Sequence, residues 1–222
     1  MMSNFDELSS ILREKNVTLV AVSKTRSIEE ILALYNCGQR DFGENRVQEM
    51  RDKYEALPKD IRWHLIGHLQ TNKVKYIAEW VHLIHSVDSL ALLEEINKQA
   101  QKHNRIIPCL LQVYIASEET KFGLDEDELI TLLKSDVYKQ MHNIAVVGLM
   151  GMATNTENVS LIRNEFSHLV QLFDKIKANY FGQDDAFRQK SMGMSSDYTI
   201  AVEIGSTMVR IGSLLFGERM VK

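Results

Sequence analysis

The sequence predicts an α/β fold, namely a single (β/α)8 TIM barrel with one extra helix at the N-terminus. Short β-branched or apolar runs alternate with segments patterned for helices, which leaves an open doubly wound sheet or a closed barrel. Eight such units favour the barrel. The length of 222 residues lies near the lower end for such a barrel, so its loops must be short.

Eight short runs supply the predicted strands. Most of them are rich in valine, isoleucine, leucine or aromatic residues, as strands are. The runs cover residues 17–22, 40–42, 61–66, 82–87, 106–114, 144–150, 188–192 and 207–211. Helix-like segments separate each run from the next, as a barrel of parallel strands requires.

Two helices are predicted near the start of the chain. The first precedes the first strand, where it is placed to plug the bottom of the barrel, and rests on apolar residues with helical spacing: Phe5, Leu8, Ile11 and Leu12. The second follows the first strand. It begins after Ser27, which forms a capping-box pattern with Glu30, and it ends at Gly38, where a left-handed residue costs little.

Apolar stripes and acidic residues predict the later helices. The stripes fall at Val47, Met50, Tyr54 and Leu57, at Leu90, Leu93, Asn97 and Ala100, and at Ile162, Phe166, Leu169, Phe173 and Ile176. Each stripe would face the sheet. Acidic residues at 125–128 occupy the first turn of another helix, where the helix macrodipole favours them. Short helical segments are expected at 197–204 and after Leu214.

Composition argues for a cytoplasmic protein with one domain, residues 1–222. The chain has 26 basic and 30 acidic residues, a net charge of −4, so charge gives no reason to expect nucleic acid or an anionic membrane as partner. Two cysteines are too few for a disulfide scaffold. The polar N-terminus lacks the pattern of a secretory signal, and the richest apolar stretch, 144–153, is about half a membrane span.

Lys24 is the first candidate for chemistry, because function in such a barrel sits where strands end and loops begin. A lysine at the end of an apolar strand would be partly desolvated, and Arg26 adds a neighbouring cation. Both effects favour the neutral, nucleophilic amine, which forms a Schiff base with an aldehyde. The alternative at this point is an ordinary solvated lysine at a strand end.

The loops after the seventh and eighth strands predict a phosphate site. Barrels often bind phosphate with these two loops. Here both loops combine glycines, which let backbone N–H groups approach an anion, with serine hydroxyls: Ser191, Gly193, Ser195, Gly212 and Ser213.

Other chemistries find less support. His64 and His68 are four residues apart and His82 and His85 three apart, but no nearby carboxylate or cysteine completes a ligand set, so we predict no metal site. The chain has no G-x-S-x-G elbow, P-loop or G-x-G-x-x-G motif. Tyr114 and Lys121 follow the fifth strand, where a position facing the mouth and a surface position are both open.

Six motifs carry a resemblance to a known family. They are AVSKT at 21–25, FGENRVQE at 42–49, WHLIGHLQTNK at 63–73, GLM at 148–150, SMGMS at 191–195 and GSTMVRIG at 205–212. In this order they resemble the YggS/PROSC family of pyridoxal 5′-phosphate (PLP)-binding proteins, over residues 17–217. The resemblance implies a fold similar to the N-terminal barrel of bacterial alanine racemases.

The resemblance also implies a role for each candidate residue. Lys24 would carry PLP as an internal aldimine, and Arg210 would face the pyridine nitrogen. Asn45 would lie beside the ring, and His68 would also belong to the cofactor site. The phosphate would lie among Ser191, Gly193, Ser195, Gly212 and Ser213.

An arginine in the position implied for Arg210 indicates a protein that holds PLP without using it for catalysis. An arginine gives no proton to the ring nitrogen, so the ring would be a poor electron sink. The racemases add a second domain that brings a tyrosine base, and this chain ends ten residues after Gly212. We therefore expect a monomeric carrier in vitamin B6 homeostasis that delivers PLP to PLP-dependent apo-enzymes. The alternatives are a PLP-dependent racemase or related enzyme, and an aldolase-like barrel without a cofactor.

Overall fold

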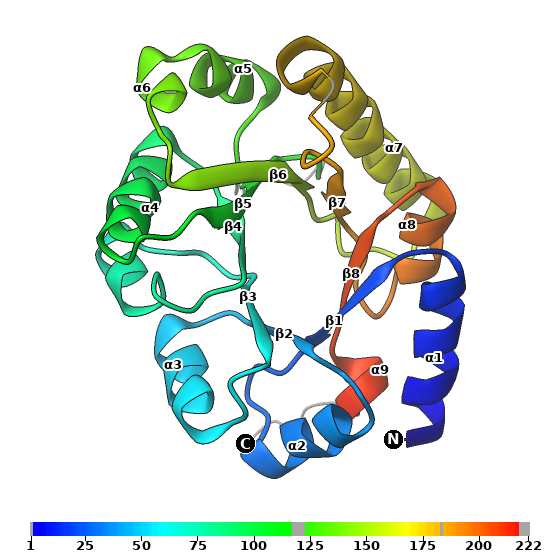
Figure 1. The fold of residues 1–222 in the computed structure, drawn as a ribbon. Coiled ribbons are helices and arrows are strands. Elements are labelled where there is room, and N and C mark those ends of the chain that lie inside the picture. Colours follow the sequence, from blue (N-terminus) through cyan, green and yellow to red (C-terminus); the bar gives the residue numbers. More distant parts are fainter. Residues whose placement is uncertain (1, 117–122, 183, 218–222) are drawn as a thin grey trace.

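Eight parallel strands close into a barrel in the order in which they occur along the chain (Figure 1). The structure is a computed structural model that describes residues 2–116, 123–182 and 184–217. Strand β1 (Thr18–Val22) pairs with β2 (Asp41–Glu44) on one side and with β8 (Met208–Ile211) on the other, which closes the barrel. The predicted (β/α)8 barrel is confirmed, and the open sheet is excluded.

The other strands lie within the predicted runs. They are β3 (Arg62–Leu65), β4 (Leu83–Val87), β5 (Ile107–Gln112), β6 (Ile144–Met150) and β7 (Gln189–Ser191). Strand β2 differs, because it continues two residues beyond the predicted 40–42 run to Glu44. The sequence pattern of Gly43-Glu44 is typical of a loop, yet both residues are buried in the sheet.

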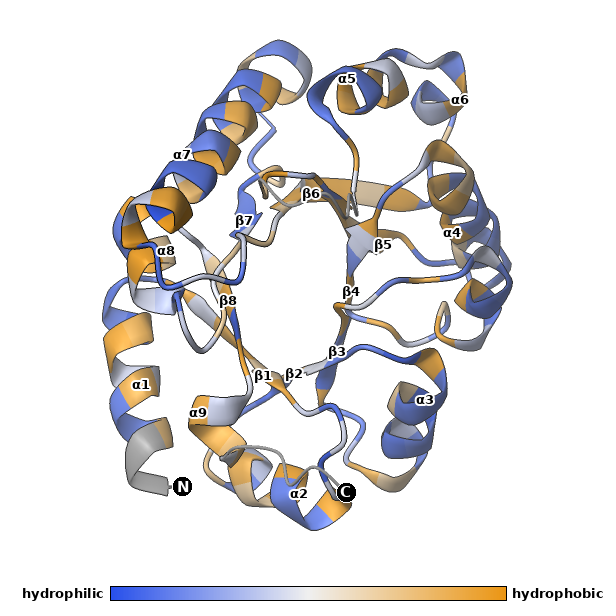
Figure 2. Cartoon of the chain, turned by 180° about the vertical axis from the view of Figure 1, so that it is seen from behind, coloured by the Kyte–Doolittle hydropathy of each residue, from blue (hydrophilic) through white to orange (hydrophobic). Residues whose placement is uncertain are grey.

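Helices surround the strands (Figure 1). They are α2 (Ile28–Asn36), α3 (Val47–Ala56), α4 (Leu90–Lys102), α5 (Glu126–Lys134), α6 (Asp136–Lys139), α7 (Val159–Ile176), α8 (Tyr198–Ile204) and α9 (Ser213–Phe216). The predicted capping box of Ser27 and Glu30 opens α2. Figure 2 shows hydrophobic and hydrophilic residues alternating along α4 and α7, as amphipathic helices require. Within the described ranges, no helix is both long and apolar enough to cross a membrane.

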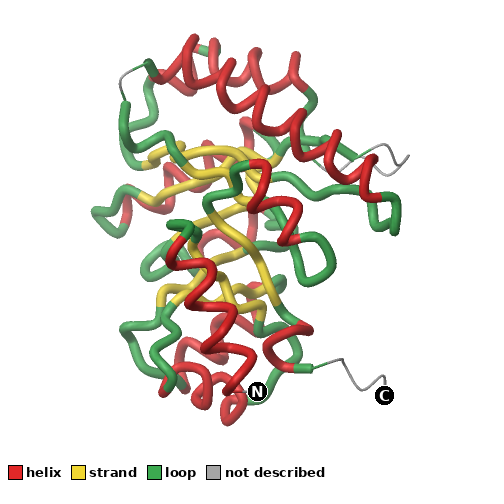
Figure 3. The backbone as a smooth tube through the Cα atoms, turned by 90° about the vertical axis from the view of Figure 1, so that its right-hand side faces the viewer, coloured by secondary structure: helices red, strands yellow, loops and turns green. Residues whose placement is uncertain are grey.

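Helix α1 (Met2–Glu14) lies outside the barrel rather than across its bottom. It packs against β1 and α9, and in Figure 3 the helix that begins at the N label crosses the outer side of the strands. Phe5, Leu8 and Leu12 are buried in this contact. The expected plug is therefore wrong. The four-residue α9 that follows β8 covers little of the sheet, and α1 covers the outer face beside it.

The inside of the barrel holds both apolar and polar side chains. A small apolar cluster, separate from the larger core between strands and helices, is formed by Val20, Leu83, Leu110, Met150 and Met208. Alternate residues of a strand point to opposite faces, so Arg210 shares the interior with Met208, two residues before it. Buried polar residues also lie in the interior with this cluster, among them His64, His85, Ser191 and Arg210.

Candidate functional site

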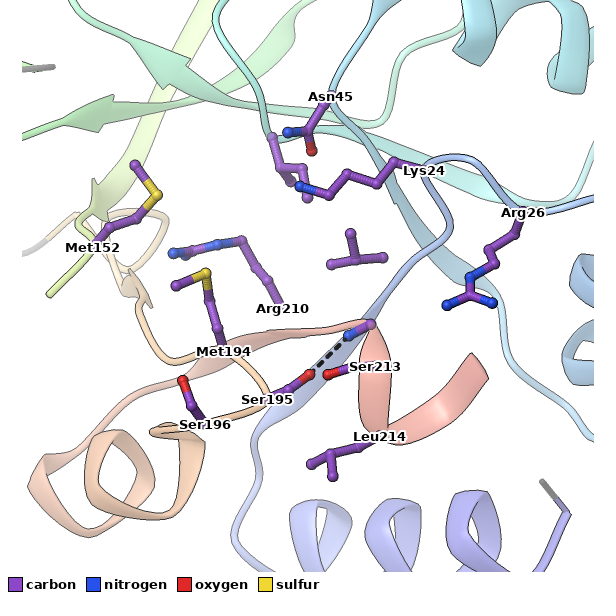
Figure 4. A pocket seen from close by; sticks show the side chains of 13 residues that line it. Lys24, Arg26, Asn45, Met152, Met194, Ser195, Ser196, Arg210, Ser213 and Leu214 are labelled. Atoms are coloured by element: carbon purple, nitrogen blue, oxygen red, sulfur yellow. Dashed lines mark hydrogen bonds between the residues drawn. The ribbon is translucent and has the colours of Figure 1, made fainter. Parts of the chain in front are cut away.

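A cavity of about 620 Å³ lies where the strands end at the barrel mouth. Its volume is in the range of small-molecule sites. Six of the nine residues predicted from the sequence line it: Lys24, Asn45, Ser195, Arg210, Gly212 and Ser213. Residues that the sequence did not single out, Met152 and Met194, add apolar wall beside Arg210 (Figure 4).

Lys24 and the serines reach the cavity from opposite sides. Figure 4 shows the side chains of Lys24 and Asn45 on one side, and Ser195 and Ser213 on the other, with Arg210 between them. Lys24 lies just after the end of β1. Because Val20 points into the barrel, Val22 at the end of the strand faces the same way, and Lys24 lines the cavity from the turn that follows.

An ion cluster beneath Lys24 holds its loop in place. Lys53, on α3, donates hydrogen bonds of 2.7 Å to the Ser23 carbonyl, to Glu44 Oε1 and to Glu49 Oε1. Ser23 Oγ donates to Glu44 at 2.6 Å, and the Thr25 N–H donates to Glu49 at 2.5 Å. Both neighbours of Lys24 are thus tied to this cluster.

The same cluster compensates a buried charge and a strained backbone. Glu44 is fully buried, which raises its pKa, and Lys53 opposes that shift. Thr25 has a φ of +66°, a left-handed conformation that is unfavourable for a β-branched residue. None of the sequence motifs predicted this cluster. The one local signal for it is the four-residue spacing of Glu49 and Lys53 on a helix.

Arg210 forms part of the cavity floor. Its Nη1 donates to Ser191 Oγ at 2.6 Å, and its Nη2 donates to the Gly151 carbonyl at 3.1 Å. Burial lowers its pKa to about 10, and the charge of Asp197 opposes that shift. The guanidinium is therefore still protonated at neutral pH and acts only as a hydrogen-bond donor.

The loops after β7 and β8 are joined at the cavity. The Gly212 N–H donates to Ser195 Oγ at 3.2 Å, the bond drawn dashed in Figure 4. A Cβ at Gly212 would lie 3.3 Å from the Val22 carbonyl oxygen, so this position favours glycine. Arg26 donates to the carbonyls of Phe216 and Gly217, which anchors α9 to the loop that carries Lys24.

Three predicted site residues do not line this cavity. Ser191 is buried in the barrel interior, where its hydroxyl lies between Arg210 and His85. Gly193 has a φ of +97°, and a Cβ there would lie 2.7 Å from the Ala201 Cβ, so its glycine serves packing against α8. His68 is mostly exposed, lies 3.3 Å from Asp88 and lines a separate cavity of about 340 Å³.

Two of the histidines, His64 and His82, lie together at the lower end of the barrel. The structure brings Asp41 close to His64 and His82, and the potential ligand atoms of the three residues lie within 4.8 Å of one another. The carboxylate that the sequence did not place near the histidines thus comes from a distant part of the chain. Both oxygens of Asp41 also accept hydrogen bonds from Arg62, which makes this an ion pair within a hydrogen-bonded cluster. Tyr114 is partly buried after β5, and Lys121 lies outside the described residues.

The chain matches one protein family along almost its whole length. Residues 1–220 match the family of the alanine racemase N-terminal domain. The pyridoxal phosphate homeostasis protein of Aquifex aeolicus is 44% identical over 207 residues, which cover 93% of this chain and 89% of the relative. The chain belongs to the pyridoxal phosphate homeostasis protein family. The homeostasis protein of Haemophilus influenzae is 35% identical over 93% of this chain and 86% of its own length.

Solved structures of similar proteins share the fold. PipY of Synechococcus elongatus with PLP bound has a TM-score of 0.84 and 34% identity, covering 96% of this chain and all of PipY. An alanine racemase of Clostridium difficile has a TM-score of 0.76 at 14% identity, covering 99% of this chain and 61% of the racemase. The racemase likeness is one of fold. The resemblance drawn from the motifs and the expected fold family are confirmed.

Proposed function

We propose that this chain binds PLP as an aldimine with Lys24 and holds it, without catalysis, in intracellular vitamin B6 homeostasis. One observation carries the proposal: a lysine, a donor-only arginine and a serine–glycine rim line one cavity. These are the three partners that an aldehyde, a ring nitrogen and a phosphate need. The homologue PipY, whose structure contains PLP, supports the choice of ligand.

Each part of the cavity suits one part of the cofactor. Lys24 supplies the amine for the aldehyde, and Asn45 lies next to it, in reach of the ring substituents. Ser195 and Ser213 lie on the far side and supply hydroxyl donors for the phosphate, and Gly212 also lines the cavity. Arg210 lies between these groups and would donate to the ring nitrogen. Ser191 would act on the cofactor through Arg210 rather than through the phosphate.

The cavity supports storage better than catalysis. Bound PLP supplies an electron sink, and the sink is strong when the ring nitrogen is protonated. Arg210 donates to that nitrogen without releasing a proton. Within the described part of the chain, the ionisable residues that line the cavity are Lys24, Arg26 and Arg210. No histidine, tyrosine or carboxylate among these residues offers a base on the opposite face, which a racemase or related enzyme needs.

The proposed carrier acts in the cytoplasm as a monomer and transfers PLP to PLP-dependent apo-enzymes. Both cysteines are free, and burial raises the pKa of the Cys109 thiol, so that side chain is a poor nucleophile toward the aldehyde. A reactive aldehyde kept on Lys24 is shielded from other amines until an acceptor takes it.

Titration with PLP and with pyridoxal tests the assignment of the phosphate site. Pyridoxal keeps the aldehyde and lacks the phosphate, so we expect it to bind far more weakly. The Ser195→Ala, Ser213→Ala double variant should narrow the ratio of the two affinities by about tenfold or more, because hydrogen bonds to a charged phosphate are each worth about 1.5–3 kcal/mol.

Ser191→Ala is the matched control for that titration. The Ser191 hydroxyl does not line the cavity. The substitution should therefore weaken the binding of PLP and of pyridoxal alike and leave the ratio of the two affinities unchanged. An unchanged ratio in the Ser195/Ser213 variant, or a narrowed ratio in Ser191→Ala, would place the phosphate elsewhere.

A further inference from the structure

A continuous chain of hydrogen bonds crosses the barrel interior from Arg210 to Asp41. Arg210 Nη1 lies 2.6 Å from Ser191 Oγ, which lies 3.0 Å from His85 Nδ1. His85 Nε2 lies 2.9 Å from His64 Nδ1, and His64 Nε2 lies 3.0 Å from Asp41 Oδ1. Five strands, β8, β7, β4, β3 and β2, each contribute one residue.

The chain joins the cavity floor to the opposite end of the barrel. Its middle members are sealed from solvent, with 0% exposure for Ser191 and His85 and 1% for His64. Asp41, at the far end, pairs with Arg62, whose side chain is 47% exposed. The two ends of the chain therefore meet different surroundings, the cofactor cavity above and the protein surface below.

When both histidines are neutral, the two terminal residues give every bond in the chain the same direction. A guanidinium only donates and a carboxylate only accepts. With neutral histidines, Ser191 accepts from Arg210 and donates its own hydrogen to His85 Nδ1. His85 donates from Nε2 to His64 Nδ1, and His64 donates from Nε2 to Asp41. In this arrangement each neutral histidine carries its hydrogen on Nε2.

The surroundings support these charge states. Burial lowers the pKa of His85 well below its ordinary value, and the nearby charge of Arg210 lowers it further. Burial alone would raise the pKa of Asp41, but hydrogen bonds from Arg62 and His64 outweigh it and hold that pKa well below its usual range. A neutral His85 and an ionised Asp41 are the states that the one-way chain needs.

We propose that Asp41, His64, His85 and Ser191 are positioning residues that fix the guanidinium of Arg210 through this one-way hydrogen-bonded chain. The cofactor site thereby extends through the barrel to Asp41. The proposal rests on the proposed function in one respect, that Arg210 faces the ring nitrogen of PLP. It also explains why Ser191 is not available to the phosphate: its single hydrogen is already donated to His85.

Nuclear magnetic resonance of PLP-free protein with ¹⁵N-labelled histidine tests the chain itself. Nitrogen shifts and two-bond couplings report which ring nitrogen carries the hydrogen. We expect His64 and His85 both to carry it on Nε2. Asp41→Asn replaces the acceptor by a group that also donates, so a population with hydrogen on Nδ1 should appear at both rings. A wild-type His85 with hydrogen on Nδ1, or a doubly protonated His64, would overturn the proposal.

Spectra and release rates of PLP-loaded protein test the link to the cofactor. Asp41→Asn and His85→Leu should shift the absorption maximum of bound PLP and speed its release by about tenfold, the ratio expected when one hydrogen bond to a charged group weakens. His82→Gln is the matched control. Its ring centroid lies 5.2 Å from that of His64, but His82 is outside the chain, so spectrum and rate should stay unchanged.

The outcomes separate this proposal from the proposed function. A wild-type protein that takes up no PLP contradicts the proposed function, while the tautomer measurement still decides the chain. Alternatively, Asp41→Asn and His85→Leu bind PLP normally, and their spectra and release rates equal those of wild type. That outcome contradicts the positioning role and leaves the proposed function intact. If His85→Leu fails to fold, the nearly isosteric Asp41→Asn decides between these outcomes by itself.

Discussion

Lys24→Ala is expected to abolish covalent attachment of PLP while leaving the barrel folded. The side chain lines the cavity rather than the apolar core, so its loss removes the amine without opening a core cavity. Wild-type protein that is incubated with PLP and reduced with borohydride should carry one pyridoxyl adduct, which peptide mass spectrometry should locate on Lys24. Lys24→Ala should not carry one pyridoxyl adduct per chain. It should still bind PLP more weakly and reversibly through the phosphate rim.

Lys73 provides the matched control for that experiment. It lines the neighbouring cavity of about 340 Å³, which shares Asn45 with the main cavity, so it is a lysine close to the site but outside it. Lys73→Ala should retain the full adduct on Lys24. A dominant adduct on Lys73 or on Lys121 in wild-type protein would contradict the assignment of the attachment site.

Lys53→Met is expected to have the largest effect on stability, a loss of about 3–5 kcal/mol in the free energy of unfolding. The substitution leaves Glu44, which is fully buried, without its cation, and it also removes the ion pair of Glu49 with Lys53. The Ser23 carbonyl loses its bond to Lys53 at the same time, so PLP occupancy should fall as well. Urea denaturation followed by circular dichroism measures the first effect, and the reduced adduct measures the second.

Two further variants identify the cause of that loss. Lys98→Met removes an exposed helical lysine whose Nζ lies 3.7 Å from Glu95, and its effect should stay within about 0.5 kcal/mol. Adding Glu44→Gln to Lys53→Met removes the uncompensated charge and should restore part of the lost stability. A Lys53→Met variant as stable as Lys98→Met would show that the ion cluster does not support the loop.

Local signals in the sequence predict most of the fold. Strand runs, apolar stripes and the Ser27 cap depend on residues close together in the chain, and all of them correspond to elements of the structure. The position of α1 could not be predicted in this way, because it depends on how much of the sheet α9 leaves uncovered. The end of β2 was missed because Glu44 is stabilised by Lys53, a partner on the next helix.

The candidate site depends on register as well as on residue type. Lys24 and Arg210 were predicted as site residues, and they line the cavity. Ser191 and Ser195 look alike in sequence, but Ser191 is still part of β7 and points into the barrel, whereas Ser195 lies in the loop that follows. The chain through His85 needs five strands in register, and no local pattern reports such an arrangement.

Exchange of the α-proton of amino acids in deuterated water tests most directly whether the cavity stores PLP rather than using it for catalysis. The measurement takes PLP-loaded protein with L- and D-alanine and a wider panel of amino acids. We predict exchange no faster than with free PLP, because Arg210 withholds a ring proton and no described residue lining the cavity supplies a base opposite Lys24. A positioned base alone contributes about 10²–10⁴-fold. Exchange far above that of free PLP, lost in Lys24→Ala, would contradict storage and identify an amino-acid racemase or a related enzyme.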